Sequence, residues 1–234
     1  MRGFFITLDG IDGAGKSTHL RKLARRLKRQ GYRVRATREP GGTKLGEAIR
    51  RLLVEGEELR IAPLAELALM VAARAEHIEE VIRPALARGE LVLSDRFSAA
   101  SYAYQGYGRG LGGDVVRTFD RAVCGPLQPD LTVVLDLDPR AALARADSRL
   151  TRHSSSQLRR PGRPAGRPGR FEREGLRFLA RVRRGYVKLA EAHPARIKVV
   201  NAALEPPEVE AQIRRAVENF LNRHPAPRRA ARES

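Results

Sequence analysis

The run from Gly10 to Ser17, Gly-Ile-Asp-Gly-Ala-Gly-Lys-Ser, constrains this chain more than any other segment. It fits the pattern Gly-x-x-x-x-Gly-Lys-Ser/Thr of a phosphate-binding loop (P-loop), in which glycines let the backbone approach an anion. Residues 4–9 before it are apolar and β-branched and predict a buried strand. Apolar residues at helical spacing after it predict a helix over 17–30 that ends at Gly31. Strand, glycine loop and helix in this order indicate a nucleotide-binding fold rather than a glycine-rich turn with an exposed lysine.

The physical chemistry of such a loop assigns roles to its residues. Backbone N–H groups and the N-terminus of the following helix hold phosphate oxygens, Lys16 reaches the outer phosphates and Ser17 ligates Mg²⁺. The residues that we expect to bind the triphosphate are Gly10, Ile11, Asp12, Gly13, Ala14, Gly15, Lys16, Ser17 and Thr18.

The rest of the chain alternates strand and helix patterns, which predicts an α/β fold with a parallel sheet flanked by helices. The expected elements are a strand at 33–37, helices at 44–54 and 63–88, a strand at 91–93, helices at 98–104 and 113–123, a strand at 131–135, a helix from Pro139 to about Arg149, a helix at 171–192, a strand at 196–200 and a helix at 206–222. We expect one kinase-type domain over residues 1–223 and a basic flexible tail over 224–234, because 234 residues suit one full core.

Length and composition also bear on location. No apolar stretch is long enough to span a bilayer, and the first predicted strand leaves no room for a signal peptide. The single cysteine, Cys124, excludes an internal disulfide and is expected to be a buried small apolar residue. We therefore expect a cytoplasmic protein without a membrane partner.

The formal net charge of +18 raises nucleic acid as a partner. Much of this charge lies in arginines at 149–173 and in the tail, among Gly, Pro and Ser, with no aromatic platform for bases. We expect general anion affinity and no specific nucleic-acid partner.

Residues 150–170 cannot bury enough apolar surface to order themselves, and their arginines repel one another. Between two helices of a P-loop enzyme, such a segment predicts a lid that folds over the triphosphate and supplies an arginine. The alternative is a solvated basic linker.

An acidic partner for Mg²⁺ is expected at the end of a neighbouring strand. Asp95 is the candidate, because Arg96 beside it adds a phosphate clamp at the same strand end. Asp136 is expected to cap a loop or the next helix. Asp9 is either an assisting carboxylate or a turn residue.

At this point the chain resembles the bacterial thymidylate kinases. The resemblance rests on motifs that occur in order along nearly the whole chain. They are Asp9–Ser17, Thr37-Arg-Glu-Pro-Gly-Gly-Thr43, Ala72-Ala-Arg74, Asp95-Arg-Phe97, Ala103-Tyr-Gln-Gly106, Arg170-Phe-Glu172 and Arg181-Val-Arg-Arg-Gly-Tyr186. The resemblance implies transfer of the γ-phosphoryl group of ATP to dTMP with Mg²⁺, on a five-stranded parallel sheet and usually in a homodimer.

Carried over to this sequence, the resemblance implies an acceptor site. It assigns Asp12 to the sugar 3′-hydroxyl, Arg38 and Arg96 to the acceptor phosphate, and Arg74 to the thymine edge. The full set of expected substrate-binding residues is Asp12, Arg38, Glu39, Pro40, Met70, Arg74, Arg96, Ser101, Tyr104 and Gln105. Tyr104 can close off the 2′ side of the sugar. The expected metal site is Ser17 and Asp95.

The expected catalytic residues are Lys16, Asp95 and Arg170. In the family's subgroup without an arginine inside the P-loop, the lid supplies it, and Gly13 occupies that loop position here. Arg160, Arg163 and Arg167 are the alternatives, because Gly169 replaces the aspartate that commonly precedes the lid arginine and the lid is unusually long. Met70 replaces the phenylalanine that typically stacks on thymine, so a looser base choice is expected.

Two other functions remain open from the sequence. One is a related deoxynucleotide or nucleoside kinase, although paired clamps at Arg38 and Arg96 favour a monophosphate acceptor. The other is a P-loop ATPase stimulated by nucleic acid, which leaves the Arg-Glu-Pro-Gly-Gly-Thr motif unexplained.

Overall fold

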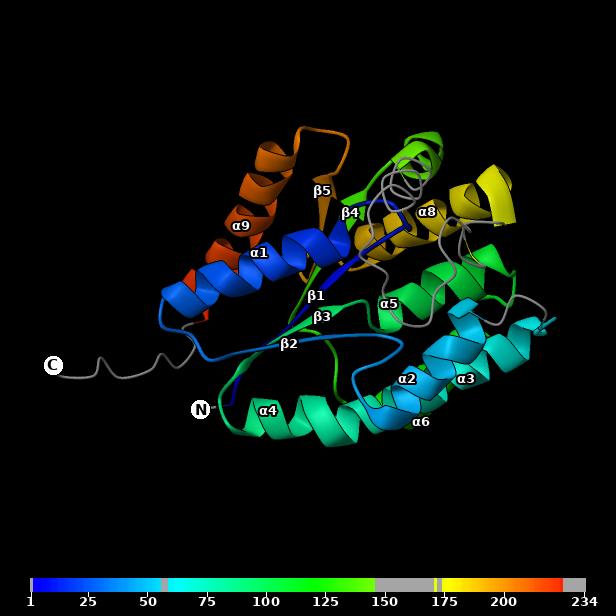
Figure 1. Ribbon diagram of the computed structural model, residues 1–234, viewed down its shortest axis with the longest axis horizontal. Helices are drawn as coiled ribbons and strands as arrows, with labels where there is room; N and C mark the ends of the chain where they lie inside the picture. Colours follow the sequence, from blue (N-terminus) through cyan, green and yellow to red (C-terminus); the bar gives the residue numbers. More distant parts are fainter. Residues whose placement is uncertain (1, 56–58, 146–170, 172–173, 225–234) are drawn as a thin grey trace, which may run out of the picture.

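A parallel sheet forms the centre of the protein. The computed structural model describes residues 2–55, 59–145, 171 and 174–224. Its five strands run in the order β2-β3-β1-β4-β5 (Figure 1). Their bounds are Phe5–Gly10 (β1), Val34–Arg38 (β2), Leu91–Asp95 (β3), Leu131–Asp136 (β4) and Ile197–Asn201 (β5). The predicted α/β fold with five parallel strands is confirmed.

The central strand, β1, is buried along its whole length between β3 and β4. Thr7 pairs in register with Ser94 on one side and with Thr132 on the other, and the two threonine hydroxyls lie 3.0 Å apart. In a parallel sheet all carboxyl ends meet at one edge. The register therefore brings Gly10, Asp95 and Asp136 to the same edge of the sheet.

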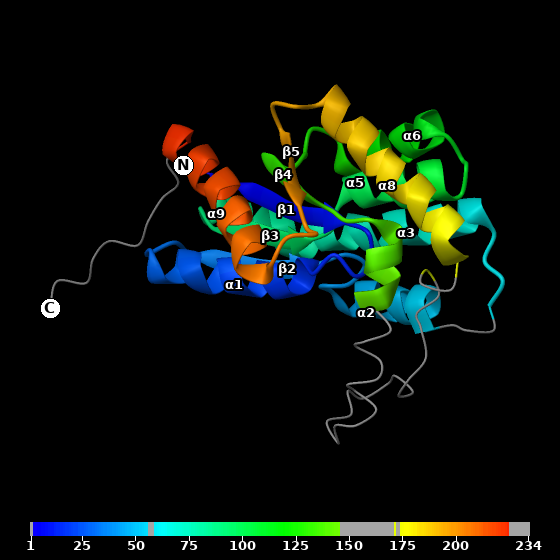
Figure 2. The ribbon, with the colours of Figure 1, turned by 90° about the horizontal axis from the view of Figure 1, so that it is seen from above.

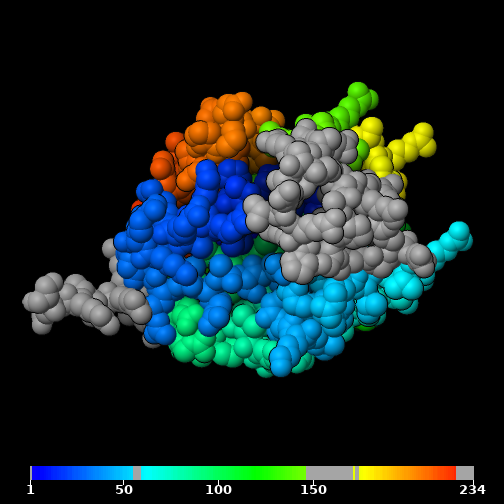
Figure 3. Space-filling view, in the orientation of Figure 1, coloured from blue at the N-terminus to red at the C-terminus, as the bar shows by residue number. Residues whose placement is uncertain are grey.

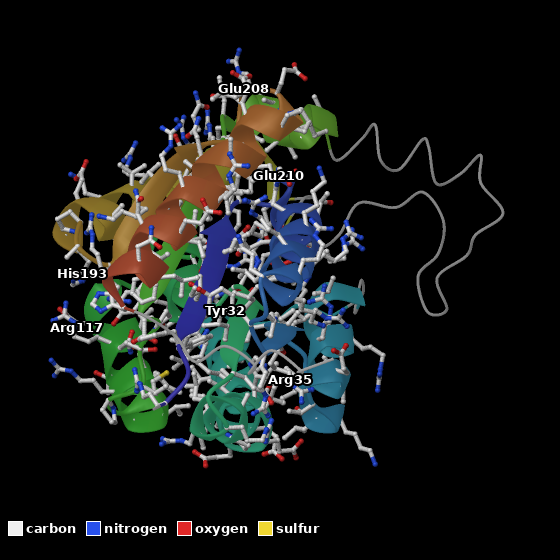
Figure 4. The ribbon with its side chains drawn as sticks, turned by 90° about the vertical axis from the view of Figure 1, so that its left-hand side faces the viewer. Tyr32, Arg35, Arg117, His193, Glu208 and Glu210 are labelled. Carbon is white, nitrogen blue, oxygen red and sulfur yellow. The ribbon has the colours of Figure 1, made fainter. Side chains whose placement is uncertain are left out.

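Helices cover both faces of this sheet (Figures 1 and 2). Their bounds are Lys16–Arg29 (α1), Lys44–Arg50 (α2), Pro63–His77 (α3), Arg83–Ala87 (α4), Ser98–Ser101 (α5), Gly113–Cys124 (α6), Gly175–Ala192 (α8) and Pro206–Arg223 (α9). A further helical segment covers 139–145. α1 and α9 adjoin on one face, as the blue and orange surfaces of Figure 3 show, while α4, α5 and α8 contact the other. Glu210 lies at the seam between α9 and α1 (Figure 4), where it accepts a hydrogen bond from Lys22 at 2.8 Å.

Within the described ranges, three π-helical turns extend the helices in ways that the sequence pattern did not predict. They are Arg51–Glu55 (η1), Ile78–Ile82 (η2) and Tyr102–Gly108 (η3). The helix predicted over 63–88 is thus one helical run of three parts, α3, η2 and α4, and Pro84 stands in the first turn of α4. The helix predicted over 171–192 begins instead at Gly175, whose φ of 80° sets it apart from a helix interior.

Several predictions fall outside the described residues. These are the lid at 150–170 with Arg170, and the tail beyond His224. Cys124 is buried, as predicted. No helix in the described part of the chain is long and apolar enough to cross a membrane.

Candidate active site

A cleft of about 610 Å³ opens where the carboxyl ends of β1, β2 and β3 meet. The P-loop forms one wall through Asp12, Gly13 and Gly15–Thr18, and the segment from Arg35 to Glu39 forms another. Asp95 and Arg96 lie at the end of β3 between them. This volume is in the range of small-molecule sites, and the position is the usual one for a ligand of an α/β sheet.

The P-loop turns tightly between β1 and α1, and its glycines make this turn possible. Gly13 has φ 91°, and a Cβ there would lie 2.4 Å from the carbonyl oxygen of Ala142. Ile11 and Ala14 point into the core, so their contribution to a ligand site comes from the backbone. Lys16 is buried, and its Nζ donates to the carbonyl oxygen of Ile11 at 2.8 Å.

Burial also sets the charge states at the base of the cleft. Burial and the charge of Arg96 lower the pKa of Lys16 to about 8, against the opposing effect of Asp12. Burial raises the pKa of Asp9 to about 6, although Arg96 and Lys16 lower it. Lys16 remains a cation at neutral pH, where it can bind phosphate oxygens.

Arg96 joins the P-loop to the helices of the opposite wall. Its guanidinium donates to the carbonyl oxygen of Gly10 at 2.9 Å, to Asp12 Oδ1 at 2.7 Å, and to the hydroxyls of Tyr104 and Tyr186 at 3.0 Å each. The Tyr104 hydroxyl donates in turn to Asp12 Oδ2 at 3.0 Å. Burial raises the pKa of Asp12, but Arg96 and Lys16 outweigh it, so the pKa of this carboxyl lies below its ordinary value. Arg96 has φ 76°, alone among the described residues other than glycine, and its hydrogen bonds hold this strained backbone.

Arg38 of β2 and Arg50 of α2 are among the further arginines that line the cleft. Arg38 donates from one nitrogen to both carboxylate oxygens of Glu47 at 2.8 Å, and about half of its side chain is exposed. Arg50 donates to the carbonyl oxygen of Pro40 at 3.0 Å and lines the same cleft. Arg50 was not among the substrate-binding residues expected from the sequence. Its position seven residues after Thr43, in the helix that follows the Arg-Glu-Pro-Gly-Gly-Thr motif, is the signal that was available.

Behind these arginines, Glu39 organises a buried polar network. It accepts from Arg74 Nε at 2.8 Å and from His77 Nδ1 at 3.0 Å, while His77 Nε2 lies 2.6 Å from the hydroxyl of Thr37. Arg74 also donates to Ser101 Oγ at 2.9 Å. Burial lowers the pKa of Arg74, but Glu39 outweighs it and keeps this arginine charged. Glu39 therefore positions Arg74, which the sequence analysis treated as an independent residue.

Met70 lies on α3, one turn before Arg74, and Gln105 lies on η3, one turn after Ser101. Met70 is half-buried on α3 and packs against two apolar clusters, one of which contains Tyr104. Gln105 is buried on η3, and its amide nitrogen donates to Glu66 at 2.8 Å. Of the expected acceptor-site residues, Met70 and Arg74 thus lie on α3, and Ser101, Tyr104 and Gln105 lie on α5 and the adjoining η3.

The residues at the mouth of the P-loop fit a Mg²⁺ ion that also has phosphate and water ligands. Ser17 Oγ donates to Asp95 Oδ2, so the hydroxyl and the carboxylate are adjacent. Asp9 Oδ2 is buried and has no hydrogen-bond partner among the residues that the structure describes. Among the described residues no group of three or more His, Cys, Asp and Glu side chains can hold a metal by itself. Mg²⁺ commonly binds through one or two side chains, phosphates and waters, which agrees with this arrangement.

Asp136 is apart from this site. It was expected to cap a loop or a helix, but its carboxylate receives two hydrogen bonds from Arg183 of α8, at 2.6 and 2.8 Å. Tyr186, one turn further along α8, contacts the site through Arg96 and through Asp9 Oδ1 at 3.3 Å. Tyr186 belongs to a motif on which the resemblance rests, yet its sequence position alone assigned it no role.

Comparison with known proteins identifies this arrangement. Residues 8–213 match the family model described as thymidylate kinase. The thymidylate kinase of Pseudomonas syringae pathovar tomato is 46% identical over 94% of this chain and 98% of its own length. That of Desulfovibrio desulfuricans is 45% identical over 94% of this chain and 97% of its own. The crystal structure of the Ehrlichia chaffeensis thymidylate kinase matches with a TM-score of 0.70 at 28% identity, covering 93% of this chain and 99% of that one. The chain therefore belongs to the thymidylate kinase family, whose reaction is the ATP-dependent phosphorylation of dTMP to dTDP.

Proposed function

We propose that this thymidylate kinase, which phosphorylates dTMP to dTDP, takes ATP on the P-loop and dTMP in the adjoining part of the cleft. One observation carries the proposal. The same cleft has Lys16, Ser17 and Thr18 on one side, and Arg38, Arg50 and Arg96 are among the arginines on the other. Two phosphate-binding walls that share one space are what direct transfer between two phosphates requires.

On the donor side, Gly10–Thr18 supply backbone N–H groups for the phosphates of ATP, and Lys16 neutralises the transferring group. Ser17 and Asp95 are the residues that would hold Mg²⁺. When bound, Mg²⁺ neutralises charge on the β- and γ-phosphates. Asp95 contributes by fixing the Ser17 hydroxyl and the position of the metal rather than by moving a proton.

On the acceptor side, Arg38, Arg50 and Arg96 clamp the phosphate of dTMP. Asp12 accepts from the 3′-hydroxyl of the sugar, and its hydrogen bond to Tyr104 places that ring beside the sugar. The base lies against Met70, with Arg74, Ser101 and Gln105 around it, and Glu39 and Pro40 shape the turn that carries Arg38. The acceptor phosphate is already an anion, so the reaction needs no general base.

We assign the catalytic arginine to Arg170, in the lid subgroup of the family. Two features of neighbouring residues support this. Gly13 leaves no space for a side chain inside the loop, because a Cβ there meets the backbone of Ala142. Phe171, the residue after Arg170, packs on the ring of Tyr104 with centroids 5.4 Å apart. The residue directly after Arg170 therefore lies beside Tyr104, in the proposed acceptor site.

We further propose a homodimer formed through α3 and α6. Leu64, Ala65, Ala68 and Ala72 of α3 are exposed in a row, and Val115 of the neighbouring α6 is also exposed. A continuous apolar face of this kind suits a symmetric interface. ATP and a DNA precursor as substrates favour the cytoplasm as the location of the reaction.

The acceptor clamp is tested with Arg38→Ala and Arg50→Ala. Each variant loses a charge-assisted contact to the acceptor phosphate, so we expect the KM for dTMP to rise by about tenfold or more with the KM for ATP unchanged. Arg117→Ala is the control, because Arg117 lies on α6 away from the cleft (Figure 4) and pairs there with Asp114. Equal rises in both KM values would contradict the separation of the two phosphate sites.

A further inference from the structure

Glu66 is a fully buried carboxylate that the account above leaves without a role. It lies on α3, four residues before Met70 and eight before Arg74. At this spacing the three residues share one face of the helix. The opposite wall has Ser101 on α5, Gln105 on η3 and Arg109 directly after η3, at the same spacing of four.

Hydrogen bonds connect these two faces at both ends. Arg74 donates to Ser101 at 2.9 Å at one end. At the other end Glu66 accepts from Gln105 Nε2 at 2.8 Å and from Arg109 Nε at 3.2 and 3.1 Å. Met70 lies between the two polar pairs. The base of the acceptor, which the proposed function puts against Met70, therefore has a donor group at one end and Gln105 at the other.

The chemistry of Glu66 fixes which end of the Gln105 amide is available. An ionised carboxylate only accepts hydrogen bonds, so the amide of Gln105 must turn its nitrogen toward Glu66. Its carbonyl oxygen then remains for a ligand, and within the described residues no other group donates to it. We infer that Glu66 is a positioning residue for base selection, which orients Gln105 so that the acceptor site offers a carbonyl oxygen to the base.

This orientation favours one class of base. Thymine and uracil carry an N–H at ring position 3, next to the carbonyl oxygen at position 4. Cytosine has the reverse pattern, with an acceptor at position 3 and an amino group at position 4. A fixed acceptor at Gln105 together with a fixed donor at Arg74 therefore matches the first pattern and opposes the second.

Arg109 keeps this arrangement in place. Its guanidinium neutralises the buried charge of Glu66. Its Nη1 atom lies 2.5 Å from Glu174 Oε1. Its guanidinium also lies over the ring of Phe178 of α8, 4.8 Å from the centroid. The orientation of Gln105 is thus anchored through Arg109 to α8 rather than to α3 alone.

The test is the ratio of kcat/KM for dTMP to kcat/KM for dCMP. In Glu66→Gln the new amide can donate or accept, so Gln105 is free to turn over. We expect this ratio to fall by about tenfold through the KM values, with kcat for dTMP little changed. Glu79→Gln is the matched control on the exposed end of the same helical run, and it should keep the ratio of the unmodified enzyme.

Two results would overturn the inference. A purely structural role for Glu66 predicts that both kcat/KM values fall by the same factor and the ratio stays constant. An unmodified enzyme with no preference for dTMP over dCMP would contradict both this inference and the assigned acceptor, so the two failures are distinguishable. If Glu66→Gln does not fold, Glu66→Asp keeps the charge opposite Arg109 while moving the carboxylate away from Gln105, and the ratio should fall in the same direction.

Discussion

The P-loop shows at the scale of single residues how a backbone position limits the source of a catalytic group. Gly13 combines φ 91° with a Cβ position 2.4 Å from a backbone oxygen, so no larger residue fits without moving residues 139–145. This agrees with our proposal that the catalytic arginine, Arg170, comes from another segment. From the sequence we expected no arginine at Gly13 because of the identity of that residue alone, whereas the structure adds the steric reason, a Cβ position that meets the backbone of Ala142.

Gly13→Ala tests this steric limit. We expect it to reduce the free energy of unfolding by more than about 2 kcal/mol and to lower kcat/KM for ATP, because strain at positive φ and the clash with Ala142 add. Gly110→Ala is the control, since Gly110 has φ 77° but no atom near its Cβ position. It should cost only about 1 kcal/mol. Equal losses in chemical denaturation of the two variants would refute the clash.

Lys16 gives a prediction on pH. Its pKa is lowered from 10.5 to about 8, so it is charged below about pH 8 and neutral above. We expect kcat/KM for ATP, which reports the free enzyme, to fall as the pH rises through 8. Between pH 8 and 10.5 the unfolded chain binds this proton more tightly than the folded one. The free energy of unfolding contributed by this lysine therefore rises as the pH rises through this range. A loss of activity with an unchanged circular dichroism spectrum therefore indicates the active site, whereas a flat profile to pH 10 would contradict the pKa.

At the scale of elements, the contact between α8 and η3 positions the two tyrosines that reach Arg96. Gly185 of α8 permits it, because a Cβ there would lie 3.0 Å from both Ala103 and the ring of Tyr107. Local patterns predicted most of α8 and only the first residues of η3, and they did not predict this contact, since it joins residues about eighty positions apart. The family resemblance implied five parallel strands, but the strand order β2-β3-β1-β4-β5 was not predicted, because no hydrophobic pattern fixes it. The sequence did not predict roles for Arg50 and Glu66 for the same reason, because the residues that they contact lie on other elements.

Gly185→Ala tests this helix contact. We expect it to destabilise the protein by about 1–3 kcal/mol through overpacking and to raise the KM for dTMP, because Tyr104 and Tyr186 move with the two elements. Gly113→Ala at the start of α6 has open space at its Cβ and should change neither quantity. Thermal unfolding and dTMP titration would measure both, and a Gly185→Ala enzyme with unchanged stability would contradict the close contact.

At the scale of the whole molecule, the predicted parallel sheet, its flanking helices and most element bounds agree with the structure. The sequence was sufficient here because buried strands and amphipathic helices carry local periodic signals.

Light scattering tests the proposed dimer. We expect twice the monomer mass for the protein and the monomer mass for Ala68→Arg, which puts a charge on the exposed face of α3. Ala195→Arg, in the exposed turn before β5, should remain dimeric, and a monomeric unmodified protein would refute the interface.

In the proposed reaction, the γ-phosphoryl group of ATP passes to dTMP within the cleft. The most direct measurement is a coupled assay of ADP release with ATP, Mg²⁺ and, in turn, dTMP, dUMP, dCMP and thymidine. We expect the highest kcat/KM for dTMP, a lower value for dUMP, and the lowest values for dCMP and for thymidine, which lacks the phosphate that the arginines bind. Equal turnover of all four acceptors, or ADP release that depends on added nucleic acid, would contradict the proposed reaction.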